Sequence, residues 1–166
     1  MDPTLLLGNF SKEEEKIETK GYILVYTYGF TDKQIKLIKG FAKTKELRIV
    51  AAGVYYYKWC DENLPVSPFQ FLTLVKNADY VITDTYHGTI FSTIYKKQFV
   101  VFTGRKIKVE QILRQLDLDN RIIDEDKDID AIIDKEIDYL KVDSILAEKR
   151  RQSSEYLTNA LNHSDR

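Results

Sequence analysis

Hydrophobic residues fall along the chain in short runs that alternate with stretches where they recur every three or four positions. Short runs rich in β-branched and aromatic residues predict buried strands, at 22–28, 47–52, 80–83 and 99–102. The three-to-four spacing predicts helices that begin near 31 and 67, after the turn 84–88 and after the loop 103–106, with two more after 128, the second over about 142–161. We expect a loop over 54–64 and a short last strand over 121–123.

Two helix starts carry specific capping patterns. Thr31 is followed three residues later by Gln34, and Ser67 by Gln70, so both starts fit a capping box. Pro68 adds the residue preferred at the first helical position.

Strands that alternate with helices through short connections predict an α/β domain with a doubly wound, mainly parallel sheet of four or five strands. We treat 1–166 as one Rossmann-like domain, with a lead-in segment 1–20, a core 21–123 and C-terminal helices over 128–162. Such domains bind ligands at the carboxyl ends of their strands. That rule selects four loops, at 27–30, 53–57, 84–89 and 103–106.

Composition narrows the class of protein. With 25 basic and 26 acidic residues the net charge is -1, which argues against a nucleic-acid binder. One cysteine, Cys60, excludes an intramolecular disulfide and, with two histidines, argues against a structural zinc site, so we expect no metal. No apolar run approaches a membrane span. We expect a cytoplasmic location, either free or peripheral at the inner face of the membrane.

His87 is the leading candidate for chemistry, because it lies between a strand's carboxyl end and a helix start, where backbone amides favour an anion. Thr85, Gly88 and Thr89 surround it as donors or close-approach residues, and we expect Asp84 to orient its imidazole or to cap the helix. The alternative is a buried core histidine, because His87 also continues an apolar helical stripe.

Arg105 and Lys106 follow the fourth predicted strand and would face the same edge, where they could bind a phosphate or carboxylate. The alternative is an exposed basic loop. Tyr28, Tyr55 and Tyr57 are candidates for stacking on a sugar or for contact with another domain, with core packing as the alternative. Neither the glycine-rich dinucleotide loop nor the P-loop pattern is present, which disfavours NAD and ATP.

Several segments resemble the polysaccharide pyruvyl transferase family. The most specific is 77–89, which reads Asn-Ala-Asp-Tyr-Val-Ile-Thr-Asp-Thr-Tyr-His-Gly-Thr, preceded by Ser67-Pro68 and Phe71-Leu72. Further similarity is spread along the chain: 1–7, Arg105, 116–118, Arg121, 138–142, Arg150, Ser153 and 157–161.

The resemblance implies the C-terminal half of a two-domain, glycosyltransferase-B-like fold, with the family's N-terminal domain absent from this chain. It also implies transfer of a pyruvyl group from phosphoenolpyruvate to sugar hydroxyls, forming a ketal on an exopolysaccharide, capsule or cell-wall glycan, without a further cofactor. Family members carry a His at the position of His87. Better-studied branches carry an Arg where this chain has Thr85, and we expect Arg105 to supply that cation instead.

Two other readings stay open: a nucleotide-sugar-dependent glycosyltransferase domain, and a non-catalytic glycan-binding or partner-binding module. On the main reading, the partners are the donor, the glycan acceptor and the family's other domain. We expect the chain alone to fold without turning over substrate, and to form a homodimer over the face that the other domain would cover.

Overall fold

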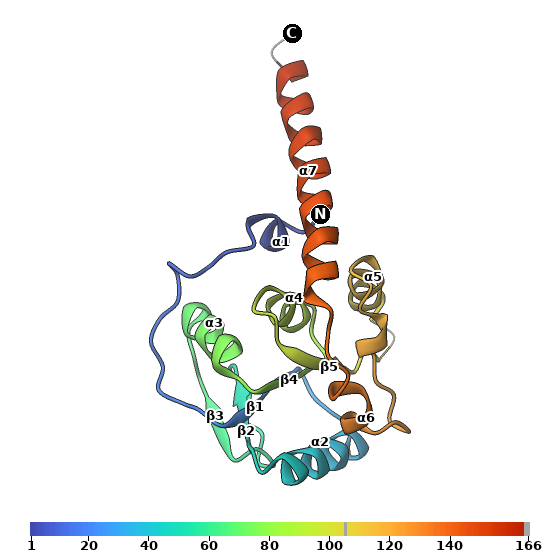
Figure 1. Ribbon diagram of the computed structural model, residues 1–166. Helices are drawn as coiled ribbons and strands as arrows, with labels where there is room; N and C mark the ends of the chain where they lie inside the picture. Colours follow the sequence, from blue (N-terminus) through green and yellow to red (C-terminus); the bar gives the residue numbers. More distant parts are fainter. Residues whose placement is uncertain (105, 165–166) are drawn as a thin grey trace.

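The core of the protein is a sheet of five parallel strands, seen in a computed structural model that describes residues 1–104 and 106–164 (Figure 1). The strands are β1 (Tyr22–Tyr26), β2 (Arg48–Ala52), β3 (Glu62–Leu64), β4 (Tyr80–Thr83) and β5 (Gln98–Val101). They lie in the order β3-β2-β1-β4-β5, and every pairing is parallel. The predicted α/β fold with a mainly parallel sheet is therefore confirmed.

The strand order creates one switch point in the sheet. From β1 the chain adds β2 and β3 on one side, and it then returns to add β4 and β5 on the other side. β1 and β4 are therefore neighbours whose following segments turn to opposite sides, with Tyr26 paired to Thr83 at their carboxyl ends. In an open parallel sheet this is the position where ligands bind.

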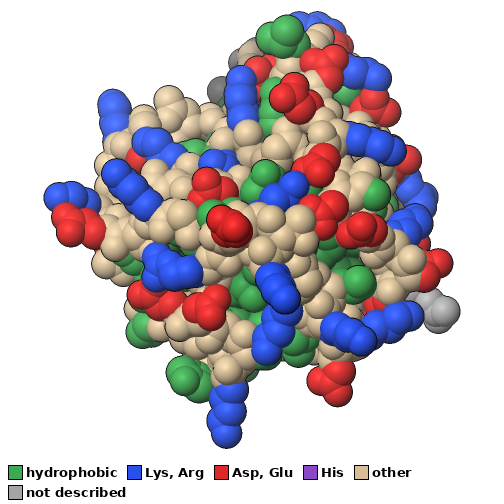
Figure 2. Space-filling model, turned by 60° about the horizontal axis from the view of Figure 1, so that its bottom comes forward, with side chains coloured by type: hydrophobic (Ala, Val, Ile, Leu, Met, Phe, Trp, Pro, Cys, Tyr) green, Lys and Arg blue, Asp and Glu red, His purple; other side chains and the backbone are tan. Residues whose placement is uncertain are grey.

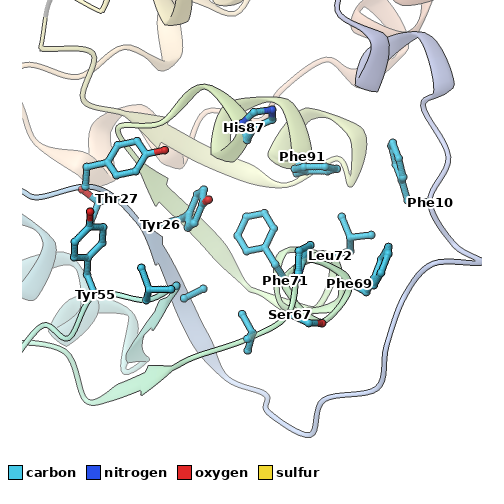
Figure 3. Close-up of a pocket in the computed structure, with 16 residues that line it drawn as sticks. Phe10, Tyr26, Thr27, Tyr55, Ser67, Phe69, Phe71, Leu72, His87 and Phe91 are labelled. Atoms are coloured by element: carbon cyan, nitrogen blue, oxygen red, sulfur yellow. The ribbon is translucent and has the colours of Figure 1, made fainter.

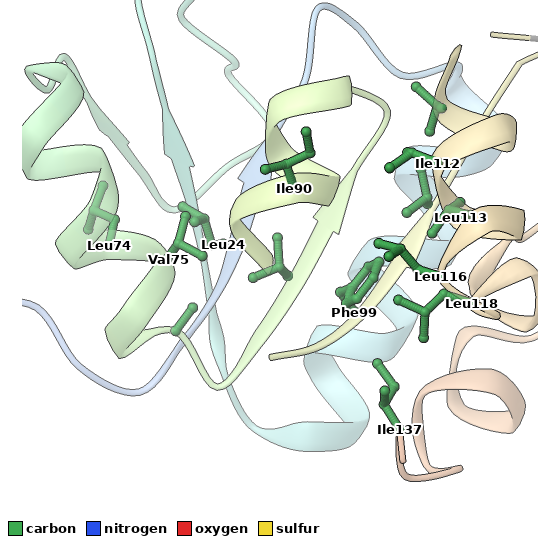
Figure 4. Packing of buried hydrophobic residues seen from close by; sticks show 14 of the residues in the cluster. Leu24, Leu74, Val75, Ile90, Phe99, Ile112, Leu113, Leu116, Leu118 and Ile137 are labelled. Atoms are coloured by element: carbon green, nitrogen blue, oxygen red, sulfur yellow. The ribbon is translucent and has the colours of Figure 1, made fainter. Parts of the chain in front are cut away.

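Helices cover both faces of the sheet (Figure 1). α3 (Pro68–Asn77), α4 (Tyr86–Ile94) and α5 (Ile107–Gln115) pack on one face, and α2 (Asp32–Lys45) and α6 (Ile129–Ile133) on the other. Alternate strand residues serve the two cores: Leu24 and Val50 point to the first, Ile23 and Val25 to the second. Figure 4 shows the first core, where Leu24 and Phe99 lie beneath side chains of α3, α4 and α5. Burial on both faces explains the continuous apolar runs in the sequence.

Both predicted capping boxes are present. The Thr31 hydroxyl accepts the Gln34 backbone N–H at 3.2 Å, while the Gln34 side chain accepts the Thr31 N–H at 2.9 Å. Ser67 and Gln70 exchange the same pair of bonds at 3.1 and 3.0 Å. These caps fix the residues at which α2 begins after β1 and α3 begins after β3.

Two predicted segments differ from the structure. The loop expected over 54–64 ends in β3, a short edge strand that pairs with β2 alone. The strand expected over 121–123 is replaced by a 3-10 turn, Asp119–Arg121, and a single bridge from Ile122 to Val101. The buried Arg121 explains the second difference, because its guanidinium donates to the Ile132 carbonyl at 3.0 Å and draws this segment toward α6.

The first helix of the chain packs against the middle of the last helix. α1 (Pro3–Leu7) packs beside the last helix, α7 (Tyr139–Ser164), and Arg150 of α7 donates to the Leu5 carbonyl at 2.9 Å. The C-terminal part of α7 projects beyond the sheet and its helices (Figure 1), with Tyr156 and Leu161 exposed. Among the described helices, none combines the length and apolarity that a bilayer crossing requires.

The face viewed from below the sheet mixes both signs of charge. Figure 2 shows basic and acidic side chains interspersed there, without a one-sign patch on that face. Ion pairs account for part of the pattern, since Lys45 of α2 lies 2.7 Å from Asp134 and 3.3 Å from Asp130 at α6. This face gives no electrostatic signal for a polyanionic partner.

Candidate functional site

The candidate site lies at the carboxyl edge of the sheet, over the switch point between β1 and β4. The segments after β1, β2, β4 and β5 converge there, as predicted from the doubly wound pattern. Two hydrogen bonds join the ends of β1 and β4: the Thr83 hydroxyl donates to the Tyr26 carbonyl at 2.6 Å, and the Tyr28 N–H donates to the Asp84 carboxylate at 3.3 Å. The edge is therefore a connected structure rather than a set of independent loops.

His87 is exposed and lies in the first turn of α4. Its ring stacks on Phe91, with centroids 6.5 Å apart and an interplanar angle of 28°. Figure 3 shows both rings on α4, across a hollow from Tyr26 and Phe71. The alternative of a buried core histidine is therefore wrong. An exposed imidazole at the rim of a hollow has the access that a proton-transfer group needs.

Thr85, Gly88 and Thr89, which we expect to bind an anion, each make hydrogen bonds within the fold. The Thr85 hydroxyl accepts the Gly88 N–H at 2.9 Å and is the N-cap of α4. The Thr89 hydroxyl, fully buried, donates to the Thr85 carbonyl at 2.9 Å. Gly88 lies so close to β4 that a Cβ atom there would be 2.2 Å from the Thr83 hydroxyl oxygen. These contacts position His87 in the first turn of α4.

Asp84 pairs with Lys106, and in the described part of the chain its hydrogen bonds do not include His87. The Lys106 ammonium donates to the Asp84 carboxylate at 2.6 Å and to its backbone carbonyl at 2.8 Å. The Asp84 side chain is 9% exposed and that of Lys106 is 42% exposed. The geometry therefore favours a role for this carboxylate in holding Lys106. The predicted role was to orient His87 or to cap the helix.

Arg105, the other predicted anion ligand, lies outside the described residues. Lys106 and Lys108 border a hollow of about 380 Å³ that Tyr28, Asp84 and Tyr86 also line. Burial raises the pKa of the Tyr86 hydroxyl, and the carboxylate of Asp2 adds to the effect. Lys106 is paired with Asp84, and Lys108 is a second, exposed cation at this hollow.

A second, larger hollow of about 420 Å³ lies on the other side of Tyr28. His87 and Phe91 form one wall, Tyr26 and Phe71 the floor, and Tyr55 the opposite rim (Figure 3). The rings of Tyr26 and Phe71 pack at 4.4 Å, and burial raises the pKa of the Tyr26 hydroxyl. The residues that line this hollow include no Lys, Arg, Asp or Glu. We name it the aromatic hollow.

Tyr57 fixes the wall of the aromatic hollow. Its hydroxyl donates to the Thr27 carbonyl at 2.8 Å, and burial raises its pKa, with a smaller effect of the Asp84 carboxylate. Asn63 of β3 accepts the Tyr57 N–H at 2.7 Å and donates to the Tyr57 carbonyl at 3.1 Å. Tyr57, predicted to contact a sugar or another domain, thus has its hydroxyl bonded within the fold, whereas Tyr28 and Tyr55 are 70% and 56% exposed.

Sequence reasoning missed Asn63, Phe91 and Phe10. The sequence pattern places Phe91 in the apolar stripe of a helix and does not indicate that its ring stacks with the His87 imidazole. Phe10 comes from the irregular segment before β1 and packs edge-on against Phe91 at 5.6 Å. An i, i+4 spacing of His87 and Phe91 was the available signal, because such pairs lie on one helix face. For Phe10 and Asn63 no local pattern predicts the contact.

The described residues include no group of three or more His, Cys, Asp or Glu side chains that could hold a metal ion. What the edge offers is one exposed imidazole, one half-exposed ammonium held by a buried carboxylate, and an uncharged aromatic hollow. This set can accept and donate protons, attract an anion and hold an uncharged ring.

Comparison with known proteins assigns the family. Curated proteins give no match to the chain. The family model described as "Polysaccharide pyruvyl transferase" matches residues 1–105. That segment spans well over half of the 166 residues, and it contains β1 to β5, His87 and the aromatic hollow. The chain belongs to the polysaccharide pyruvyl transferase family.

Proposed function

We propose that this protein takes part in transfer of a pyruvyl group from phosphoenolpyruvate to two hydroxyls of a sugar, in the biosynthesis of an exopolysaccharide, capsule or cell-wall glycan. One observation carries the proposal: the family segment places an exposed His87 at the switch point, facing a hollow and 19 residues before a lysine at the same edge. A second domain, implied by the family resemblance, would supply the opposite wall of the cleft.

The proposed reaction needs proton transfer and no redox step. One acceptor hydroxyl adds to C2 of the enolpyruvyl group while C3 takes up a proton and becomes a methyl group. A second hydroxyl then displaces phosphate from C2, and its proton leaves with the phosphate. The products are a cyclic ketal and inorganic phosphate. His87 is the group that moves these protons, as general base for a hydroxyl and general acid toward C3.

The donor carries a phosphate and a carboxylate, so it needs cations. Lys106 and Lys108 are the described cations of the hollow beyond Tyr28, and Arg105 follows the same strand. Lys106 is held by Asp84 at 2.6 Å and still has 42% of its side chain exposed, so a phosphate oxygen can approach its free side. Thr85 caps α4 and does not replace the arginine found in other branches.

Donor binding to the full chain tests the proposal. Phosphoenolpyruvate, UDP-glucose and inorganic phosphate are titrated separately, with phosphorus NMR as the readout. We expect phosphoenolpyruvate to bind best, and Lys106→Met to weaken it about tenfold, the loss of one charge-assisted bond. Lys36→Met, an exposed lysine of α2 with the same charge change, is the matched control and should leave binding unchanged.

Chemistry is followed by phosphate release from phosphoenolpyruvate in the presence of a glycan, in a two-domain version of the protein, because we expect the chain alone not to turn over. His87→Gln should remove that release without weakening donor binding. Tighter binding of UDP-glucose than of phosphoenolpyruvate would favour the glycosyltransferase reading. Binding of neither ligand would refute the proposal and favour a non-catalytic module.

A further inference from the structure

The aromatic hollow has no assigned ligand, and its chemistry excludes the donor. Among the described residues, the lining side chains include His87 and no lysine, arginine, aspartate or glutamate. Phosphoenolpyruvate would lose part of its hydration there without gaining a lysine or arginine partner among the described lining residues. The ligand of this hollow is therefore uncharged.

The distribution of rings and hydroxyls defines the ligand further. The floor consists of aromatic faces, with Phe71 5.9 Å from Phe91 and 4.4 Å from Tyr26. The rim consists of tyrosines that combine a ring face with a hydroxyl, Tyr28 and Tyr55, both more than half exposed. A purely apolar ligand would make no use of these hydroxyls. A sugar ring matches both features, because its C–H bonds pack on ring faces while its hydroxyls point outward.

The hollow is preformed. The Tyr57 hydroxyl joins the loop after β2 to Thr27 at the end of β1, and two bonds from Asn63 hold the same loop to β3. On the opposite side, Phe10 packs on Phe91, and the Glu15 N–H of the same segment donates to the Phe69 carbonyl at 3.4 Å. A volume of about 420 Å³ falls in the usual range for small-molecule sites. A preformed wall lowers the ordering cost of binding.

We propose that the aromatic hollow is the acceptor subsite, and that it takes an uncharged hexopyranose ring stacked between Tyr55 and the His87 wall. This inference rests on the proposed function and adds a division of the two substrates. Tyr28 lines both hollows, and the Lys106 ammonium lies 5.9 Å from its ring centroid. The uncharged acceptor lies on the His87 side of Tyr28, the phosphate and carboxylate of the donor lie on the Lys106 side, and the reacting carbons C2 and C3 of the donor lie between them, within reach of His87.

Saturation-transfer NMR on the full chain tests the subsite, because it detects weak binding. The probe is methyl β-D-glucopyranoside, and its charged match is methyl β-D-glucuronide, which differs only in the carboxylate at C6. We expect transfer to the ring protons of the glucoside and at least fivefold less to the glucuronide. Tyr55→Ala should abolish most of the glucoside signal.

Tyr56→Ala is the matched control, because Tyr56 is 75% exposed in the same loop and does not line the hollow. It should leave the signal unchanged, and since both tyrosines are exposed neither variant should lose its fold, as checked by circular dichroism. Equal signals in the two variants, equal signals from the two sugars, or no signal from the wild-type chain would each overturn the acceptor subsite.

The donor titration separates this inference from the proposed function. If phosphoenolpyruvate binds through Lys106 and the glucoside does not bind, the subsite fails and the proposed function stands. If the glucoside binds as expected and phosphoenolpyruvate does not, the subsite stands and the proposed donor fails. A glucoside signal that disappears when phosphoenolpyruvate is added would also overturn the division, because the two ligands would then compete for one hollow.

Discussion

Gly88 is where the fold and the candidate site are most tightly linked, and its replacement by alanine is the sharpest perturbation. A Cβ atom at this position would lie 2.2 Å from the Thr83 hydroxyl oxygen, 2.7 Å from that of Thr85 and 2.9 Å from the Thr83 Cβ. Neither oxygen can move freely. Thr83 bonds the Tyr26 carbonyl and the Thr85 N–H, and Thr85 caps α4. Alanine must therefore break the cap or push α4 away from β4.

The expected cost follows from three contributions. Overpacking a tight site costs about 1–3 kcal/mol. Loss of the threonine cap adds about 1 kcal/mol. The better helix propensity of alanine returns about 1 kcal/mol. The net destabilisation of Gly88→Ala is about 1–3 kcal/mol, which lowers the melting temperature of a chain of this size by roughly 2–12 °C.

Gly40→Ala is the matched control, because it makes the same substitution inside α2. Gly40 is exposed, and its added Cβ would meet no atom within 4 Å. It should stabilise the protein by about 0.5–1 kcal/mol. Thermal unfolding, followed by circular dichroism, measures the stability of both variants. The double variant Thr83→Ala, Gly88→Ala should be destabilised by less than the sum of the two single variants. Equal shifts for the two variants, or a Gly88→Ala variant at least as stable as the wild-type protein, would refute the close-approach argument.

Two further predictions follow from buried ionisable groups. Burial raises the pKa of the Tyr22 hydroxyl, with a smaller effect of Asp79, so the folded state holds this proton more tightly than the unfolded state. The contribution of Tyr22 to stability should be constant below pH 10 and be lost as pH rises above it, so the fall in stability above pH 10 should be shallower in Tyr22→Phe. Urea unfolding at a series of alkaline pH values measures this, and a rise in stability above pH 10 would contradict it. Burial raises the pKa of the Cys60 thiol to about 12, and the Asp61 carboxylate adds to the effect. At pH 8 the reaction of this thiol with a disulfide reagent should therefore be about a thousandfold slower in the folded protein than in denaturant. Comparable rates in the two conditions, followed by absorbance of the released thiol, would contradict this account of Cys60.

The fold could be predicted largely because its signals are local. The capping boxes at Thr31 and Ser67 depend on residues three positions apart, and each buried strand is a continuous apolar run. β3 was missed because Glu62–Leu64 is short, half-buried and paired on one side only, so it needs no apolar run. The strand predicted at 121–123 failed because Arg121 is buried by a contact with Ile132, which no local pattern announces.

The position of the candidate residues in the fold could be predicted better than the contacts that they make. The doubly wound pattern selects the carboxyl edge, and His87 lies there, exposed. The roles of Thr85 and Gly88 depend on Thr83, which faces α4 only because β4 ends where it does. The partner of Asp84 is 22 residues away in sequence, and proximity along the chain favoured His87 instead. Contacts across the sheet edge are set by strand order, which a single sequence does not encode locally.

The pair of Asp84 and Lys106 explains why a carboxylate belongs at the end of β4 even though it does not touch the imidazole. Asp84 is buried at the switch point and accepts one backbone N–H, from Tyr28, so without Lys106 it would be an inadequately paired buried charge. Lys106 in turn is held toward the ring of Tyr28, at the boundary between the two hollows. A cation fixed in this way is attractive to a donor phosphate, and it lines the hollow beyond Tyr28 and not the aromatic hollow. The pair thereby gives the proposed division of the substrates a structural cause: charge is confined to one side of Tyr28, and the uncharged rings and the imidazole occupy the other.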